Sequence, residues 1–166
     1  MGKEVENLEN FKKAITSTIK SIIGDQNIDV TFGSEIVKKN INIISLPSVQ
    51  NIDNKIDYIK TRALADSGAL KLKCSDKNIY DSFEPQGKIS KILYAVAEKI
   101  RYENIGSSYF LGIKENLNQY YKIKAKQKND PKDDVYEFVD AFENYLRSKI
   151  FKLSNNSDTE KKYKKY

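Results

Sequence analysis

The chain has 166 residues, and its 29 Lys and Arg against 23 Asp and Glu give a formal net charge of +6 at pH 7. It contains no histidine and one cysteine, which excludes an internal disulfide, Ser-His-Asp and Cys-His catalysis, and nearly every structural zinc site. A carboxylate-only Mg²⁺ or Ca²⁺ site stays open.

The length fits one domain that buries its own core. No apolar run is long enough to cross a membrane, and the first residues lack the apolar stretch of a secretory signal. Together with the lone thiol, these features favour the cytoplasm and no membrane contact.

The basic composition raises the question of nucleic-acid binding. Only three of the 29 basic residues are arginines, namely Arg62, Arg101 and Arg147, and the lysines are scattered along the chain. Phosphate and base recognition prefers the planar fork of arginine. We therefore rank nucleic-acid binding behind a protein-binding role.

An amphipathic helix is predicted over residues 7–23. Its apolar side chains recur at steps of three and four residues, which places them on one face. They are Leu8, Phe11, Ile15, Thr18 or Ile19, and Ile22. Gly24 follows directly and suits the position just after a helix end.

Two short β-like runs come next, at residues 28–32 and 41–46. In the first run Ile28, Val30 and Phe32 alternate with polar residues, so we expect them to face the core. A Gly-Ser pair supplies turn material between the runs, and a proline closes the second. The two runs are predicted to pair as a hairpin that packs on helices, because an isolated hairpin is only marginally stable.

The helical period returns from Ile52 to Leu70, with Asp53 as a candidate N-cap. Gly68 interrupts this pattern at a cost of about 1 kcal/mol against alanine. It either ends the helix early or lets another backbone come close. Residues 76–88 contain several breakers and are predicted to be a connection.

Three further helices are predicted toward the carboxyl end. The first starts at Ile89 and is expected to end at Gly106, and the second covers residues 107–122. A loop at residues 129–131 precedes the last helix, for which Asp133 or Asp134 is the expected cap. The apolar stripe of that helix is Val135, Phe138, Val139, Phe142, Leu146 and Ile150.

These patterns predict a mainly α-helical protein with about five helices and one small β-hairpin. Residues 1–153 form the expected single domain. Residues 154–166 are polar and lysine-rich, and we expect them to be a solvated tail or the start of a linker.

Charged side chains within the predicted helices have spacings that allow pairing. Arg62 and Asp66 are four residues apart, and Glu98 and Arg101 are three apart, so each pair can form along its helix for about 0.3–0.5 kcal/mol. Glu103 is two residues beyond Arg101 and faces another way. One of these two is therefore expected to bridge to Arg62 or Asp66 in a buried cross-helix network, unless it contacts a partner protein.

Several short motifs follow one another between residues 28 and 118. They are Val30-Thr31-Phe32-Gly33, Leu46-Pro47, Arg62-Ala63-Leu64-Ala65-Asp66-Ser67-Gly68-Ala69-Leu70, Cys74-Ser75-Asp76, Pro85-Gln86-Gly87, Glu98-Lys99-Ile100-Arg101-Tyr102-Glu103-Asn104-Ile105-Gly106, Gly112-Ile113 and Asn116-Leu117. No single motif is specific, but their order and spacing resemble the amino-terminal region of the CobT subunit of aerobic cobaltochelatase. Two positions depart from the family pattern: Ser75 stands where the family has a histidine, and Ala63 where it has a glycine.

The resemblance implies a role in an assembly. In the family, CobT works with the AAA+ subunit CobS and the large subunit CobN to insert cobalt into a corrin ring precursor of cobalamin at the expense of ATP. The complex would use ATP, magnesium and cobalt, and no cofactor is expected in this chain, which has no P-loop motif. The family's acidic linker and von Willebrand-type domain do not occur in these 166 residues, so we expect the chain to be either a fragment of a longer protein or a truncated gene product.

The sequence therefore predicts a non-catalytic module with no catalytic, cofactor or metal residues of its own. Its expected structural or partner-contact residues are Arg62, Asp66, Asp76, Glu98, Arg101, Glu103, Gly106 and Asn116. Cys74 is expected to be a small buried apolar residue, since no base is available to activate it.

Two alternatives to this module stay open. A carboxylate metal site aiding cobalt delivery would require Asp66, Asp76 and Glu103 to converge. A basic nucleic-acid-binding module would require lysines on one face and binding that weakens steeply with salt.

Overall fold

A computed structural model describes residues 2–33, 43–50, 52–126 and 134–151. The elements in chain order are α1 (Gly2–Ile23), β1 (Asp29–Phe32), β2 (Ile43–Leu46), α2 (Lys55–Cys74), α3 (Lys77–Phe83), α4 (Lys88–Tyr109), α5 (Leu111–Lys126) and α6 (Asp134–Ile150). The predicted mainly α-helical fold is confirmed, with six helices in the described ranges where about five were expected.

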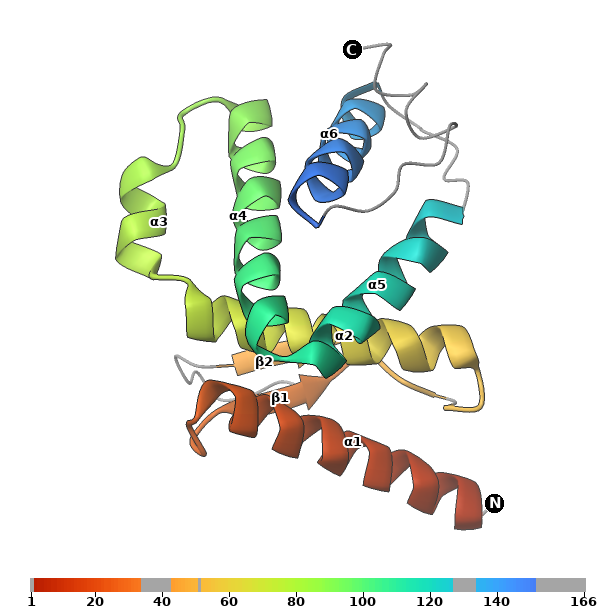
Figure 1. The fold of residues 1–166 in the computed structure, drawn as a ribbon. Coiled ribbons are helices and arrows are strands. Elements are labelled where there is room, and N and C mark those ends of the chain that lie inside the picture. The colour runs from red at the N-terminus through yellow and green to blue at the C-terminus, as the bar shows by residue number, and fades with distance from the viewer. Residues whose placement is uncertain (1, 34–42, 51, 127–133, 152–166) are drawn as a thin grey trace.

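Helix α2 lies at the centre of the molecule. It packs against α1, α4, α5 and β2, and α4 packs in turn against α5 and α6. In Figure 1, α1 lies below α2, and α4 and α5 rise above it. The hydrophobic core fills the space between these elements. Its buried members are Phe11, Ile15, Ile19, Ile22, Ile28, Ile44, Leu46, Val49, Ala63, Ala65, Ala69, Leu70, Tyr102, Ile113 and Leu117.

Helix α2 begins one residue later than its predicted cap implied. Its N-cap is Asn54, not Asp53, and the Asn54 side chain accepts a hydrogen bond from the Ile56 N–H at 3.0 Å. Gly68 does not end the helix. A Cβ at Gly68 would lie 3.1 Å from the Ile44 side chain, so the glycine gives room to a side chain of β2.

The two strands pair in parallel, so the predicted hairpin is wrong. Asp29 is in register with Ile43, and Phe32 with Leu46. A hairpin needs a tight turn, commonly of two to five residues, whereas residues 33–42 separate these strands. Alternation of apolar and polar side chains identifies a strand but carries no information on its direction.

Helix α3 occupies most of the segment that was predicted to be a connection. Asp76 caps it by accepting hydrogen bonds from the backbone N–H groups of Asn78 and Ile79. The helix has only seven residues and none of them is buried, so its sequence shows one apolar pair at helical spacing, Ile79 and Phe83, and no repeating stripe.

Other helix ends also moved from their predicted places. Helix α1 already begins at Gly2, and α5 runs from Leu111 to Lys126. Gly106 lies inside α4, which continues to Tyr109, so the expected helix end there is wrong. Gly24 has the positive φ of +83° that its predicted place after α1 requires.

Several predictions concern residues outside the described ranges. These are Asp133 as a cap, the loop at 129–131 and the tail at 154–166. The alternative cap, Asp134, is instead the first residue of α6. Among the described helices, none is long and apolar enough to span a bilayer.

A buried polar network as the candidate site

Glu103 of α4 is the centre of a network that joins four helices. Its side chain is completely buried, at 0% exposure. The carboxylate accepts hydrogen bonds from Ser67 Oγ of α2 at 2.5 Å and from the Tyr121 hydroxyl of α5 at 3.1 Å. It also forms an ion pair with Arg147 of α6, with Nη1 and Oε2 2.7 Å apart.

Arg147 brings α6 into this network. Its guanidinium lies 3.4 Å from the centroid of the Tyr121 ring and donates to the Tyr121 hydroxyl at 2.6 Å. It also pairs with Glu143 at 3.1 Å, and Glu143 pairs with Lys124 of α5 at 2.6 Å. The acids Glu103 and Glu143 are thus each paired with a base where α4, α5 and α6 meet, and Asp140 lies 3.7 Å from Lys124 at the rim.

Burial and the neighbouring charges together determine the protonation states of these groups. Burial raises the pKa of Tyr121, as it does that of Tyr102, which reaches about 12. Burial opposes the charged form of Glu143, but Lys124 and Arg147 outweigh it and hold the Glu143 pKa below its usual value. The phenols therefore stay protonated as donors while Glu143 stays ionised.

Asp66 and Asn116 form a second buried contact, between α2 and α5. The Asn116 Nδ2 donates to Asp66 Oδ2 at 2.7 Å, and Asp66 is only 2% exposed. Burial raises the Asp66 pKa, while the Asn116 hydrogen bond and the charge of Arg62 act in the opposite direction. The direct partner of Asp66 is thus Asn116, and the predicted Arg62–Asp66 pair is reduced to a charge effect.

The predicted pair of Glu98 and Arg101 is confirmed. Arg101 Nε and Nη2 donate to the two oxygens of Glu98 at 2.6 and 2.7 Å. The same Nη2 donates to the Cys74 carbonyl at 2.7 Å, and Ser75 Oγ donates to Glu98 at 2.7 Å. This surface cluster ties the carboxyl end of α2 to α4, and the Arg101 hydrogen bonds hold the pKa of Glu98 below its usual value.

The expected cross-helix ion network exists, but its arginine is Arg147 and not Arg62 or Arg101. Glu103 is the bridging residue, as one of the two alternatives predicted. The available signal for Arg147 was its place four residues after Glu143 in α6, one of three arginines in the chain. Arg147 lies beside the apolar stripe that predicted α6, and the stripe itself does not single it out.

The carboxylates proposed for a metal site are used separately. Asp66 binds Asn116, Asp76 caps α3, and Glu103 binds Arg147. Across the described ranges, no three Cys, Asp or Glu side chains gather closely enough to hold a metal ion. Cys74 is half-buried, less covered than expected.

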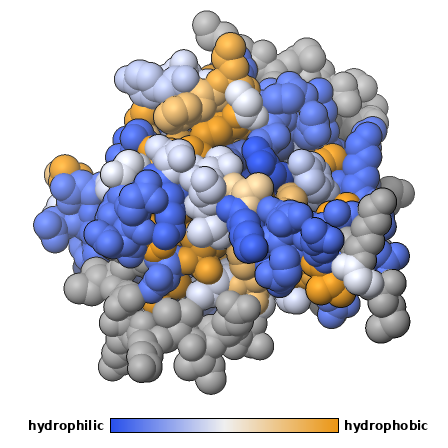
Figure 2. Space-filling model, turned by 90° about the horizontal axis from the view of Figure 1, so that it is seen from below, coloured by the Kyte–Doolittle hydropathy of each residue, from blue (hydrophilic) through white to orange (hydrophobic). Residues whose placement is uncertain are grey.

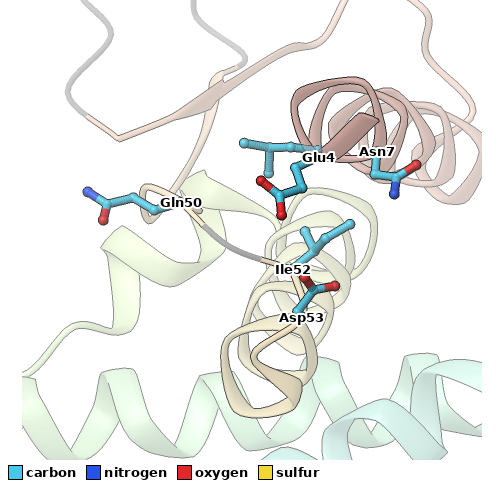
Figure 3. A pocket seen from close by; sticks show the side chains of 6 residues that line it. Glu4, Asn7, Gln50, Ile52 and Asp53 are labelled. Carbon is cyan, nitrogen blue, oxygen red and sulfur yellow. The ribbon is translucent and has the colours of Figure 1, made fainter. Parts of the chain in front are cut away.

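A pocket elsewhere on the molecule contains none of the motif residues. It lies between the first turns of α1 and the segment before α2, and in Figure 3 the Glu4 carboxylate points toward Ile52. The lining residues are Glu4, Asn7, Leu8, Gln50, Ile52 and Asp53. The candidate site is therefore the buried network around Glu103, together with the outer surfaces of the four helices that this network joins.

A family model described as cobalamin biosynthesis protein CobT matches residues 5–142. The chain belongs to the CobT family. Family membership gives it a role in cobalamin biosynthesis. The matched range includes Asp66, Glu103 and Asn116 but ends before Glu143 and Arg147, so CobT motifs could not have pointed to the arginine. No solved structure matches this fold.

Proposed function

We propose that the chain is a non-catalytic assembly module of an ATP-dependent cobaltochelatase. Its partners are the AAA+ subunit CobS and the large subunit CobN, and the complex inserts cobalt into a corrin ring precursor in the cytoplasm. Under this proposal ATP, magnesium and cobalt are handled by those partners.

The observation that supports this proposal is that the motif carboxylates bind side chains of neighbouring helices. Asp66 and Glu103 are buried and hydrogen-bonded between helices. A general acid or base must lie within hydrogen-bonding reach of its substrate, and these two side chains are enclosed by their own partners. Their role is to hold the helices at fixed positions, which is what a docking module requires.

Helix α3 offers the surface that suits a partner subunit. Ile79 and Phe83 are four residues apart on one face and are 59% and 73% exposed. Figure 1 shows α3 at the edge of the molecule beside α4, which it contacts through the rings of Tyr80 and Tyr94, with centroids 4.8 Å apart. The neighbouring charges pair among themselves, Lys77 with Asp81 and Lys91 with Glu84. The contact is therefore expected to be apolar and resistant to salt.

A pull-down of the purified chain against the AAA+ and large subunits from the same source, with and without ATP, tests the proposal. We expect retention in high salt, and a loss of about tenfold or more in affinity for Phe83→Asp. Tyr109→Asp is the matched control, because Tyr109 is 76% exposed at the far end of α4. A folded chain that binds neither subunit contradicts the proposal, and equal losses in both variants contradict the assignment to α3.

A further inference from the structure

The outer edge of β1 has no neighbouring strand among the residues that the structure describes. In the described ranges the sheet consists of β1 and β2 alone. The Gly33 N–H donates to the Leu46 carbonyl at 2.8 Å, and backbone groups alternate sides along a strand. The N–H and C=O groups of Thr31 therefore face β2, and those of Val30 and Phe32 point away from it.

The side chains of Val30 and Phe32 in β1 are also partly exposed to solvent at this edge. Val30 and Phe32 are in register with Ile44 and Leu46 of β2. The two β2 residues are buried, at 7% and 3% exposure, whereas Val30 and Phe32 are only half-buried. An open strand edge is a template for a further strand, and a neighbour beyond β1 would cover both side chains.

A basic groove lies next to this edge, between α1 and the end of β1. Three lysines line it together with Phe32, and Lys12 Nζ is 5.9 Å from the centroid of the Phe32 ring. The lysines are Lys12, Lys13 and Lys20. Glu9 is the one acid in the lining and pairs with Lys12 at 2.9 Å. In Figure 2, which views the molecule from the α1 side, hydrophilic residues cover much of the surface and apolar residues are exposed in patches between them.

We propose that the β1 edge and this groove bind an extended acidic peptide segment as a third strand. Its backbone pairs with Val30 and Phe32, and its carboxylates reach the lysines of α1. Acids at every second position fit best, since alternate side chains of a strand share one face. Three such acids span about 13 Å, close to the rise of about 12 Å from Lys12 to Lys20 along α1.

Charge and backbone geometry together select this occupant. The groove has three lysines against one glutamate, which favours an acidic segment over a neutral or basic one. The strand edge offers N–H and C=O groups at the spacing of a peptide backbone, which a nucleic acid cannot match. The surface is separate from α3, so the inference goes beyond the proposed assembly role.

The first experiment measures binding of a fluorescein-labelled nine-residue peptide, in which Glu alternates with Val, to the full chain by fluorescence anisotropy. Lys13→Glu with Lys20→Glu is expected to weaken binding at least tenfold. Lys114→Glu with Lys122→Glu changes the charge equally at two exposed positions of α5 and is expected to change affinity less than twofold. Equal losses in the two double variants, both shown to be folded by circular dichroism, would overturn the assignment to the groove.

The second experiment separates strand addition from simple ionic attraction. Two versions of the peptide are N-methylated at alternate amides, one at odd and one at even positions. One version should lose at least tenfold in affinity and the other should bind normally. Amide exchange at Val30 and Phe32 should slow when the unmodified peptide binds, while exchange at Thr31 should not change.

Two outcomes would overturn the proposal outright. Equal binding of both methylated peptides would mean that no strand is added. An oligothymidine strand that binds as tightly as the peptide, and is weakened by the same lysine substitutions, would assign the groove to polyanions in general.

Discussion

Gly106 is glycine because Leu70 of α2 occupies the space that a side chain would need. A Cβ at Gly106 would lie 2.1 Å from Leu70 Cδ2 and 2.8 Å from its Cγ. Leu70 is fully buried, at 0% exposure, so it has little freedom to move aside. Gly106 thus sets how closely α4 approaches α2, a role that outweighs its poor helix propensity.

Gly106→Ala is expected to lower the free energy of unfolding by about 1–3 kcal/mol, because the added methyl group overpacks the contact. Gly112→Ala is the matched control, since nothing lies within 4 Å of a Cβ at that helical position. There the better helix propensity of alanine should add up to about 1 kcal/mol. Urea denaturation of the two variants measures both effects, and a stabilising Gly106→Ala would contradict the close contact.

Asp66 carries a buried carboxylate whose pKa is raised above its usual 3.8, first of all by burial. The favourable contribution of Asp66 to the free energy of unfolding is complete below pH 3.8 and is lost as the pH rises through the folded-state pKa. Asp66→Asn keeps an acceptor for Asn116 and removes the charge. We expect this variant to gain stability relative to the parent chain as the pH rises from 3.8 to 7.

Glu98→Gln is expected to show the opposite dependence of stability on pH. The Arg101 hydrogen bonds lower the Glu98 pKa below 4.5, so its contribution is present above pH 4.5 and is lost as the pH falls through the folded-state pKa. We expect Glu98→Gln to be less stable than the parent chain at pH 7 and equal to it in acid. Urea midpoints at several pH values test both variants, and parallel curves would contradict the two pKa directions.

Among the elements, α6 is attached by buried charged groups as well as by its apolar stripe. The stripe correctly predicted a helix, but its members Phe138, Val139, Phe142 and Leu146 are only half-buried. The buried residues of α6 are Ala141, Glu143 and Arg147. No residue of α6 belongs to the main hydrophobic core.

Periodicity predicted five of the six described helices and both strands, because their apolar side chains face a core. It missed α3, none of whose residues is buried. It also could not give the parallel direction of the strands. The motif carboxylate Glu103 was recognised, but its partner Arg147 lies 44 positions further along the chain, and only the packing of α6 on α4 brings them together.

Arg147→Met is expected to lower the free energy of unfolding by about 3–5 kcal/mol, because it leaves the buried Glu103 carboxylate without its counter-charge. Adding Glu103→Gln should recover part of this loss, since a neutral amide is less costly to bury. The loss in free energy of unfolding for the double variant should be smaller than the sum of the two single losses by at least about 1 kcal/mol. Additive effects in urea denaturation would mean that the two residues are not coupled.

On the scale of the whole molecule, the core and the network divide the helices into two groups. The core includes buried residues from α1, the sheet, α2, α4 and α5. Helix α6 contacts this body mainly through α4. The partners of its ion pairs are Glu103 of α4 and Lys124 of α5. The CobT match likewise ends inside α6, at residue 142.

Native-state hydrogen exchange tests whether these groups open separately. We expect amides of α6 to exchange with a lower free energy, and a weaker dependence on denaturant, than those of Ile19 and Ala69 in the core, because undocking α6 exposes less apolar surface than unfolding of the whole chain. Raised salt should increase exchange in α6 only slightly, since buried ion pairs are poorly screened. If α6 amides instead share the free energy and denaturant slope of the core amides, the Glu103 network joins all the helices into one cooperative unit.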